Sequence, residues 1–186
     1  MMKALKAALA AVAVAFVFGF ASVQSAKAIN VTYSTTGSPS TFTAGGGGNT
    51  ATITFTGVSN VTVSANPTTF GSLGNFQTSA TENYGATFDP TPFTLTITQS
   101  VPPGGSGNFS AILAGTLQSD GSTVTVTFST TQIVLGDVIY QLTSNPLTLA
   151  PPSTNNGITS VQVQITAVPE PATMLLLGTG LAGLAG

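Results

Sequence analysis

The sequence Phe93-Thr94-Leu95-Thr96-Ile97-Thr98 shows the repeat from which the fold can be predicted. Successive side chains of an extended chain point to opposite sides, so Phe93, Leu95 and Ile97 share one side and the threonines share the other. This alternation is typical of a β-strand with one face on a core and one face in water. It predicts a half-buried strand at residues 93–98.

The same period of two recurs on both sides of this strand, interrupted by Gly, Pro, Asn and Asp. Ser119–Ser122 and Gly136–Asp137 each separate two such runs and predict hairpins, the second with a type II′ turn because glycine comes first. The other apolar alternations lie in segments 31–33, 51–55, 61–63, 109–117, 124–128, 133–135, 138–142, 147–149 and 161–165.

Two regions lack clean alternation. Residues 34–48 form a loose Ser, Thr and Gly stretch, and its final run Gly45–Gly48 resembles a linker rather than a phosphate loop, because no Lys and no helix pattern follow. Residues 70–92 place their aromatic residues at irregular intervals among glycines and polar residues. We expect a long connection there, with one or two short strands.

These segments give about eight or nine strands, each with one apolar side. Two sheets that pack face to face hide one side of every strand and expose the other. The sequence therefore predicts an all-β fold, an antiparallel β-sandwich with Greek-key or jelly-roll connections. Residues 29–167 have the usual size of one domain.

Charged residues make up only 4% of the 186 residues. All three basic residues precede Ala28, so residues 29–167 contain no Lys or Arg, while Ser and Thr supply about a third of them. Hydroxyl groups must therefore face the water in place of charges. Binding to nucleic acid is excluded as an expected function, because it depends on basic side chains that neutralise phosphates.

The N-terminal residues have the order of a secretory signal peptide. Lys3 and Lys6 precede an uncharged, mainly apolar run at residues 7–21, and a short polar segment ends in Ala26-Lys27-Ala28. We predict a signal peptide at residues 1–28, with the cleavage site defined by Ala26 and Ala28. Export machinery and a signal peptidase are the expected partners.

The C-terminal segment, residues 168–186, begins with a rigid polar head. Pro169 and Pro171 fix the backbone on both sides of Glu170, and fifteen uncharged residues follow. This pattern resembles the PEP-CTERM sorting signal of exported bacterial proteins. The resemblance implies processing by an exosortase, transient contact of the tail with the membrane, and a location in the cell envelope, at its surface or outside the cell. Similar tails are also labelled ice-binding protein C-terminal domains, a label that describes the tail alone.

The apolar run of this tail is short for a membrane segment. Fifteen helical residues span roughly 22 Å, whereas the hydrocarbon core of a bilayer is about 30 Å thick. Signals of this family usually finish with a cluster of basic residues, and none is present before Gly186. We therefore expect that the sequence is truncated at this end.

Candidate catalytic and metal-binding residues are few. The chain has no His and no Cys, and its only closely spaced carboxylates within the domain are Glu82 and Asp89, which lie in the irregular region. Asp120 and Asp137 occur in turns, where Asp is usually present for turn geometry, and no calcium-loop motif surrounds them. We predict no catalytic residue, no metal site and no cofactor.

The resemblance to the PEP-CTERM signal implies an exported protein of the cell surface or extracellular matrix, associated with extracellular polysaccharide, and the absence of catalytic candidates makes the predicted function non-enzymatic. One alternative is a glycan-binding module, although the chain lacks Trp and offers only Tyr33, Tyr84, Tyr140 and some Phe for stacking on sugars. Another is an ice-binding surface made from two threonine ladders. Threonine is also a favoured outward residue in strands, which is the simpler interpretation. The ladders are Thr94, Thr96, Thr98 and Thr123, Thr125, Thr127.

Overall fold

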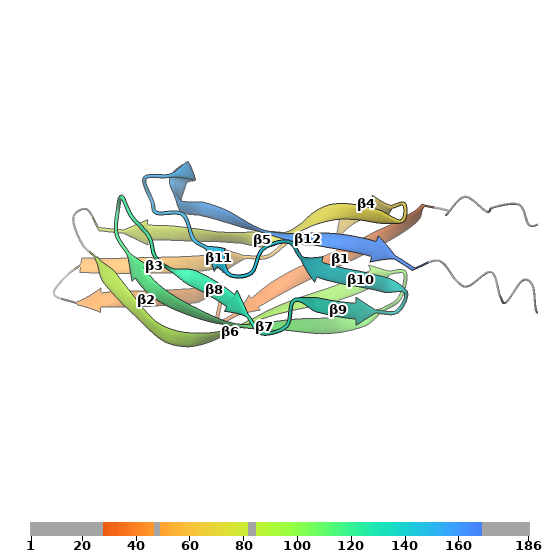
Figure 1. Ribbon diagram of the computed structural model, residues 1–186, viewed down its shortest axis with the longest axis horizontal. Coiled ribbons are helices and arrows are strands. Elements are labelled where there is room, and N and C mark those ends of the chain that lie inside the picture. The colour runs from red at the N-terminus through yellow and green to blue at the C-terminus, as the bar shows by residue number, and fades with distance from the viewer. Residues whose placement is uncertain (1–27, 47–48, 82–84, 169–186) are drawn as a thin grey trace, which may run out of the picture.

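The computed structural model describes residues 28–46, 49–81 and 85–168, and these contain no α-helix (Figure 1). The elements are β1 (Ile29–Ser38), β2 (Thr41–Gly46), β3 (Asn49–Thr56), β4 (Val61–Ala65), β5 (Thr68–Ala80), β6 (Ala86–Val101), β7 (Gly105–Leu117), β8 (Thr125–Phe128), β9 (Gln132–Leu135), β10 (Val138–Leu142), β11 (Leu147–Thr148), the 3₁₀ turn η1 (Asn155–Gly157) and β12 (Ile158–Ala167).

The strands form two antiparallel sheets of six strands, which confirms the predicted all-β sandwich. The first sheet, here sheet A, has the order β11-β8-β7-β6-β1-β4, and the second, sheet B, has the order β2-β3-β5-β12-β10-β9. The chain crosses repeatedly between the two layers, whereas β6, β7 and β8 follow one another within sheet A. Both predicted hairpins are present, and Gly136 has the positive φ of 56° that the turn between β9 and β10 requires.

The apolar side chains predicted to share a face are buried between the sheets. Phe93 is 1% exposed, and Leu95 and Ile97 are fully buried, whereas the threonines between them reach the surface. The same holds for Ala51, Ile53 and Phe55 in β3. Burial of one side of each strand is thus the main favourable term for this domain, which has no cysteine.

The strand count is higher than the eight or nine expected, because the irregular regions also form strands. Residues 70–92, expected as a long connection, belong largely to the long strands β5 and β6. In β5, an extra residue near Gly74 shifts which positions point inward. Leu73 and Phe76 are therefore both buried, although they are three positions apart. In β6, a second irregularity between Phe88 and Thr91 has the same effect. Each β-bulge adds one residue to the strand and thereby reverses the alternation.

The loose stretch at residues 34–48 is also largely strand. Residues 34–38 complete β1, and β2 pairs with β3 so that Phe42 lies opposite Ile53. Phe42 is 5% exposed, and its ring lies 6.1 Å from that of Phe93 in the other sheet. A single buried aromatic residue therefore fixes this edge strand, although its neighbours in sequence are mainly polar.

Candidate functional site

The predicted sorting residues Pro169, Glu170 and Pro171 lie outside the described residues, and so does Ala26 of the predicted cleavage site. Ala28 is exposed and directly precedes β1. At the other end, Ala167 N–H donates to Pro67 O at 2.8 Å and Val168 N–H donates to Asp137 O at 2.8 Å. These backbone bonds hold the chain to the domain as far as Val168.

Both limits of the domain lie at the same end of the sandwich. Ile29 pairs with Ala65 on β4, and Ala167 bonds to Pro67 two residues further on. Figure 1 shows β1 beginning and β12 ending at the same side of the molecule. The predicted export signal and the sorting tail therefore attach at neighbouring points.

The candidate carboxylates do not form a site in the part of the chain that the structure describes. Asp89 is exposed at the bulge of β6, and Asp120 and Asp137 are exposed in two separate turns. Glu82, the proposed neighbour of Asp89, lies outside the described residues. Among residues 28–46, 49–81 and 85–168, no three His, Cys, Asp or Glu side chains come together as metal ligands.

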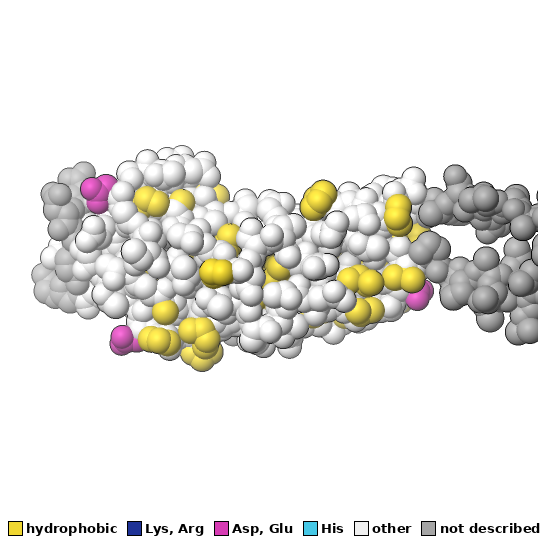
Figure 2. All heavy atoms as spheres, viewed as in Figure 1, with side chains coloured by type: hydrophobic (Ala, Val, Ile, Leu, Met, Phe, Trp, Pro, Cys, Tyr) yellow, Lys and Arg dark blue, Asp and Glu magenta, His cyan; other side chains and the backbone are white. Residues whose placement is uncertain are grey.

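The outer surface of sheet A carries in-register rows of hydroxyl groups, which we call the hydroxyl face. On the side of the molecule seen in Figure 2, most exposed side chains are likewise neither charged nor apolar. Neighbouring hydroxyls bond to each other, as in the 3.0 Å contact between Thr98 Oγ1 and Ser106 Oγ. The rows across β1, β6 and β7 are Ser34, Thr98, Ser106, then Thr36, Thr96, Asn108, and then Ser38, Thr94, Ser110.

The two threonine ladders considered for ice binding do not join. The ladder of residues 94–98 lies on β6, whereas Thr125 and Thr127 lie on β8, and β7 runs between them. Thr123 precedes β8, and its Oγ1 accepts the backbone N–H of Thr116 at 3.0 Å. Thr127 pairs across the strands with the exposed Ile112. The hydroxyl array of β1, β6 and β7 therefore extends onto β4 through the 2.8 Å contact of Thr32 Oγ1 with Thr62 Oγ1, but it does not extend onto β8.

The outer surface of sheet B has a different chemistry, with amide groups beside an exposed aromatic ring. We call the four residues that lie side by side across β5, β12, β10 and β9 the glutamine row. Its members are Phe70, Gln164, Gln141 and Gln132, in that order. Phe70 is 65% exposed. The sequence alone did not reveal this surface, although Gln141 and Gln164 occupy outward positions of predicted strands and Gln132 directly precedes another.

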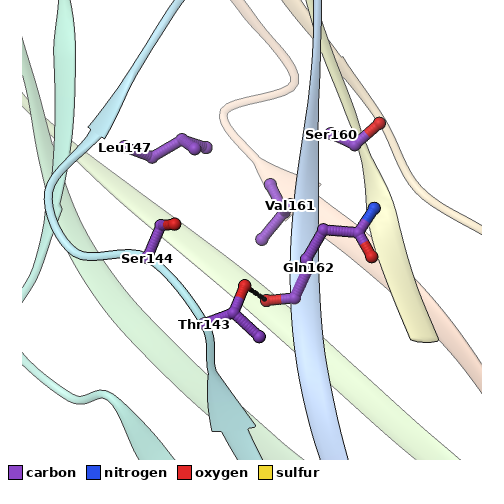
Figure 3. A pocket seen from close by; sticks show the side chains of 6 residues that line it. All are labelled: Thr143, Ser144, Leu147, Ser160, Val161 and Gln162. Carbon is purple, nitrogen blue, oxygen red and sulfur yellow. Dashed lines mark hydrogen bonds between the residues drawn. The ribbon is translucent and has the colours of Figure 1, made fainter. Parts of the chain in front are cut away.

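A small pocket lies beside this surface (Figure 3). Its volume is about 30 Å³, room for roughly two water molecules, so it cannot enclose a sugar. Thr143 Oγ1 donates to Gln162 O at 3.2 Å across its wall, as Figure 3 shows. The lining residues are Thr143, Ser144, Leu147, Ser160, Val161 and Gln162.

Two of the tyrosines considered for stacking on sugars are buried. The interpretation that they could stack on a sugar was therefore wrong. Tyr33 and Tyr140 are fully buried with their ring centroids 5.9 Å apart. Tyr33 Oη donates to Ser72 O at 3.0 Å, and Tyr140 Oη donates to Gln99 Oε1 at 2.8 Å. Burial raises the pKa of Tyr33 to about 12 and raises that of Tyr140 further. Tyr84 lies outside the described residues.

The described residues form an all-β domain whose last strand, β12, ends at Ala167. Residues 167–186 match the family model described as the PEP-CTERM protein-sorting motif. No curated protein and no solved structure matched the chain. The motif supports export, processing by an exosortase and sorting to the cell surface.

The predicted membrane contact of the tail concerns residues beyond Val168, which the structure does not describe. Within the described ranges, no helix has the length and hydropathy needed to cross a bilayer. The signal peptide and its cleavage after Ala28 stay predictions.

Proposed function

We propose that this protein is a non-enzymatic component of the cell surface or extracellular matrix that associates with exopolysaccharide. The observation that supports it is the chemistry of the two outer sheet surfaces. The hydroxyl face and the glutamine row present hydroxyl and amide groups in register, with no charged side chain among them.

Hydroxyl and amide groups each donate and accept hydrogen bonds, as the hydroxyls of a polysaccharide do. Each such bond to a partner molecule contributes little, since it replaces a bond to water. A long polymer that crosses several rows can nevertheless be held by many of them together. The sorting motif brings this surface to the cell exterior, where such polymers are found.

The association is tested by co-sedimentation. The exported protein is purified from the producing cells and mixed with polysaccharide extracted from the same cells. We expect the protein to sediment with the intact polymer and to return to the supernatant after the polymer is depolymerised. Protein that stays in the supernatant with intact polymer would contradict the proposal.

A separate measurement tests whether the protein has enzymatic activity on the polysaccharide. We expect no release of reducing sugar when the protein is incubated with this polysaccharide. Release that disappears in the Asp89→Asn variant would replace the proposal by a glycosidase with a carboxylate at the β6 bulge.

Ice binding is the second candidate, and the continuous hydroxyl array on β1, β6 and β7 is the observation that favours it. If the protein binds ice, the purified protein should show thermal hysteresis. Loss of that hysteresis in Thr96→Ala, at the centre of the array, would assign the activity to the hydroxyl face.

A further inference from the structure

The glutamine row presents side-chain amide groups that have no partners within the described part of the protein. Gln164 lies between Phe70 on β5 and Gln141 on β10, and Gln132 lies beyond Gln141 on β9. Within the described residues, Gln99 is the only glutamine whose side chain forms a hydrogen bond. The three amides of the row are therefore available to a ligand.

The dimensions and exposure of the row suit an extended ligand. Four neighbouring strands place its ends about 14 Å apart, because adjacent strands are separated by about 4.8 Å. Phe70 is 65% exposed at one end, and Gln141 and Gln132 are exposed at the other. The ligand would thus meet an aromatic ring first and two or three amides after it.

The chemistry of the row selects a neutral, hydroxyl-rich ligand. An amide presents a donor and an acceptor side by side, which matches two neighbouring hydroxyls of one sugar. The apolar face of an aromatic ring packs against the C–H groups of a sugar ring and contributes most when it is shielded from water. The described residues include no Lys or Arg, so a polyanion would find no opposite charge.

We propose that the glutamine row is a binding site for an uncharged polysaccharide chain that lies across β5, β12, β10 and β9. Phe70 stacks on one sugar ring, and Gln164 and Gln141 bind hydroxyls of the sugars that follow. This inference rests on the proposed association with polysaccharide and assigns that association to one face of sheet B.

The test measures binding of the full-length protein, kept in a polyoxyethylene detergent that has no sugar headgroup. Depletion by insoluble cellulose and retardation in gels containing amylose report binding to neutral glucans, and alginate gels report binding to a polyanion. The variants are Phe70→Ala, Phe70→Leu and the double variant Gln141→Ala with Gln164→Ala. The matched control, Thr54→Ala with Gln77→Ala, removes one cross-strand pair of sheet B that belongs neither to the glutamine row nor to the hydroxyl face.

We expect the wild-type protein to bind at least one neutral glucan and not alginate. Phe70→Ala should weaken binding about tenfold, and the double glutamine variant by about fivefold to tenfold. Phe70→Leu keeps an apolar side chain without the ring, so weakened binding in this variant shows a requirement for the aromatic ring. The control should bind as the wild-type protein does, and thermal melts should show that every variant is folded.

The outcomes separate this inference from the proposed function. Wild-type binding that all row variants retain would overturn the glutamine row as the site and leave polysaccharide association standing. Wild-type protein that binds none of these polymers, nor the polysaccharide of its own cells, would overturn both. Concentration-dependent dimerisation that Phe70→Ala abolishes would assign the face to a second copy of the chain instead.

Discussion

The two halves of the sandwich interior join the same two sheets by different interactions. In the half built on β2 and β3, the ring of Phe93 from sheet A packs against Phe55 and Phe76 of sheet B, with centroids 5.3 Å and 5.2 Å away. In the half where β1 begins and β12 ends, the rings of Tyr33 and Tyr140 also meet between the sheets, but here hydrogen bonds of both hydroxyl groups join the two sheets as well. We call these the phenylalanine half and the tyrosine half (Figure 1).

The comparison teaches that the two halves respond to different perturbations. Ring packing depends on volume and on the absence of cavities, and it is insensitive to pH. The buried hydroxyls depend on having partners, and they lose those contacts when they ionise. In the tyrosine half, Gln99 completes the network, since its Nε2 also donates to Pro102 O at 2.6 Å. Every buried side-chain N or O atom of the described residues has a partner.

The largest effect is expected from Phe93→Ala in the phenylalanine half. The ring is 1% exposed and meets three other rings, so its removal leaves a cavity and should cost about 3 to 5 kcal/mol of unfolding free energy. The measurement is the urea midpoint at unchanged m-value. Phe70→Ala is the matched control, because the same substitution at a 65% exposed position should cost less than about 0.5 kcal/mol. Equal midpoints for the two variants would contradict the packing described for this half.

A smaller effect is expected from Gln99→Leu in the tyrosine half. Leucine has a similar volume but leaves the Tyr140 hydroxyl and the Pro102 carbonyl without their partner, at a cost of about 1 to 3 kcal/mol. Gln77→Leu at an exposed position of β5 is the control. If Tyr140→Phe added to Gln99→Leu costs as much as it does alone, the two side chains are not coupled, and the network is not what stabilises this half.

The extent to which this interior could be predicted from the sequence depends on the regularity of each strand. Phe93, Leu95 and Ile97 were predicted as core residues because their strand alternates without interruption from residue 93. Phe76 could not be placed, because the bulge at Gly74 changes which residues point inward, and this follows from pairing with the distant β12. The register of two strands far apart in sequence has no local signal.

The same limit applies to the candidate surface. The outward positions of Gln132, Gln141 and Gln164 follow from local alternation, but their side-by-side arrangement depends on the order of β9, β10 and β12 in sheet B. The opposite error occurred for Tyr33, which is a candidate for sugar contact in the sequence because the chain has no Trp and few other aromatic residues. Its hydroxyl is satisfied by Ser72 O inside the sandwich, which permits full burial.

The tyrosine half should also make stability depend on pH in the alkaline range, an effect that Phe93 cannot produce. A pKa raised to about 12 in folded Tyr33 means that the folded state keeps a proton which the unfolded state begins to release near pH 10. The stabilisation that comes from this raised pKa is complete below about pH 10 and is lost as the pH rises towards about 12. We expect a constant urea midpoint from about pH 7 to 9 and a modest decrease by pH 10.5.

The matched variant for this pH dependence is Tyr33→Phe with Tyr140→Phe. It should be less stable at pH 8, because the partners of both hydroxyls are left unpaired. Its midpoint should nevertheless decrease less between pH 9 and 10.5 than that of the wild-type protein. An identical decrease in both proteins would show that other groups cause it.

The smallest effect on stability is expected from removal of the sorting motif, which follows the tyrosine half. The last described bonds to the domain are those of Ala167 to Pro67 and of Val168 to Asp137, so deletion of residues 169–186 should leave the urea midpoint unchanged while altering the location of the protein in its producing cells. Deletion of residues 167–186 removes both bonds as well and should cost about 1 to 3 kcal/mol. Cell fractionation and urea unfolding of the two truncated proteins separate sorting from folding. If the shorter deletion already unfolds the domain, the apolar tail is part of the tyrosine half, and its interpretation as a sorting signal alone is wrong.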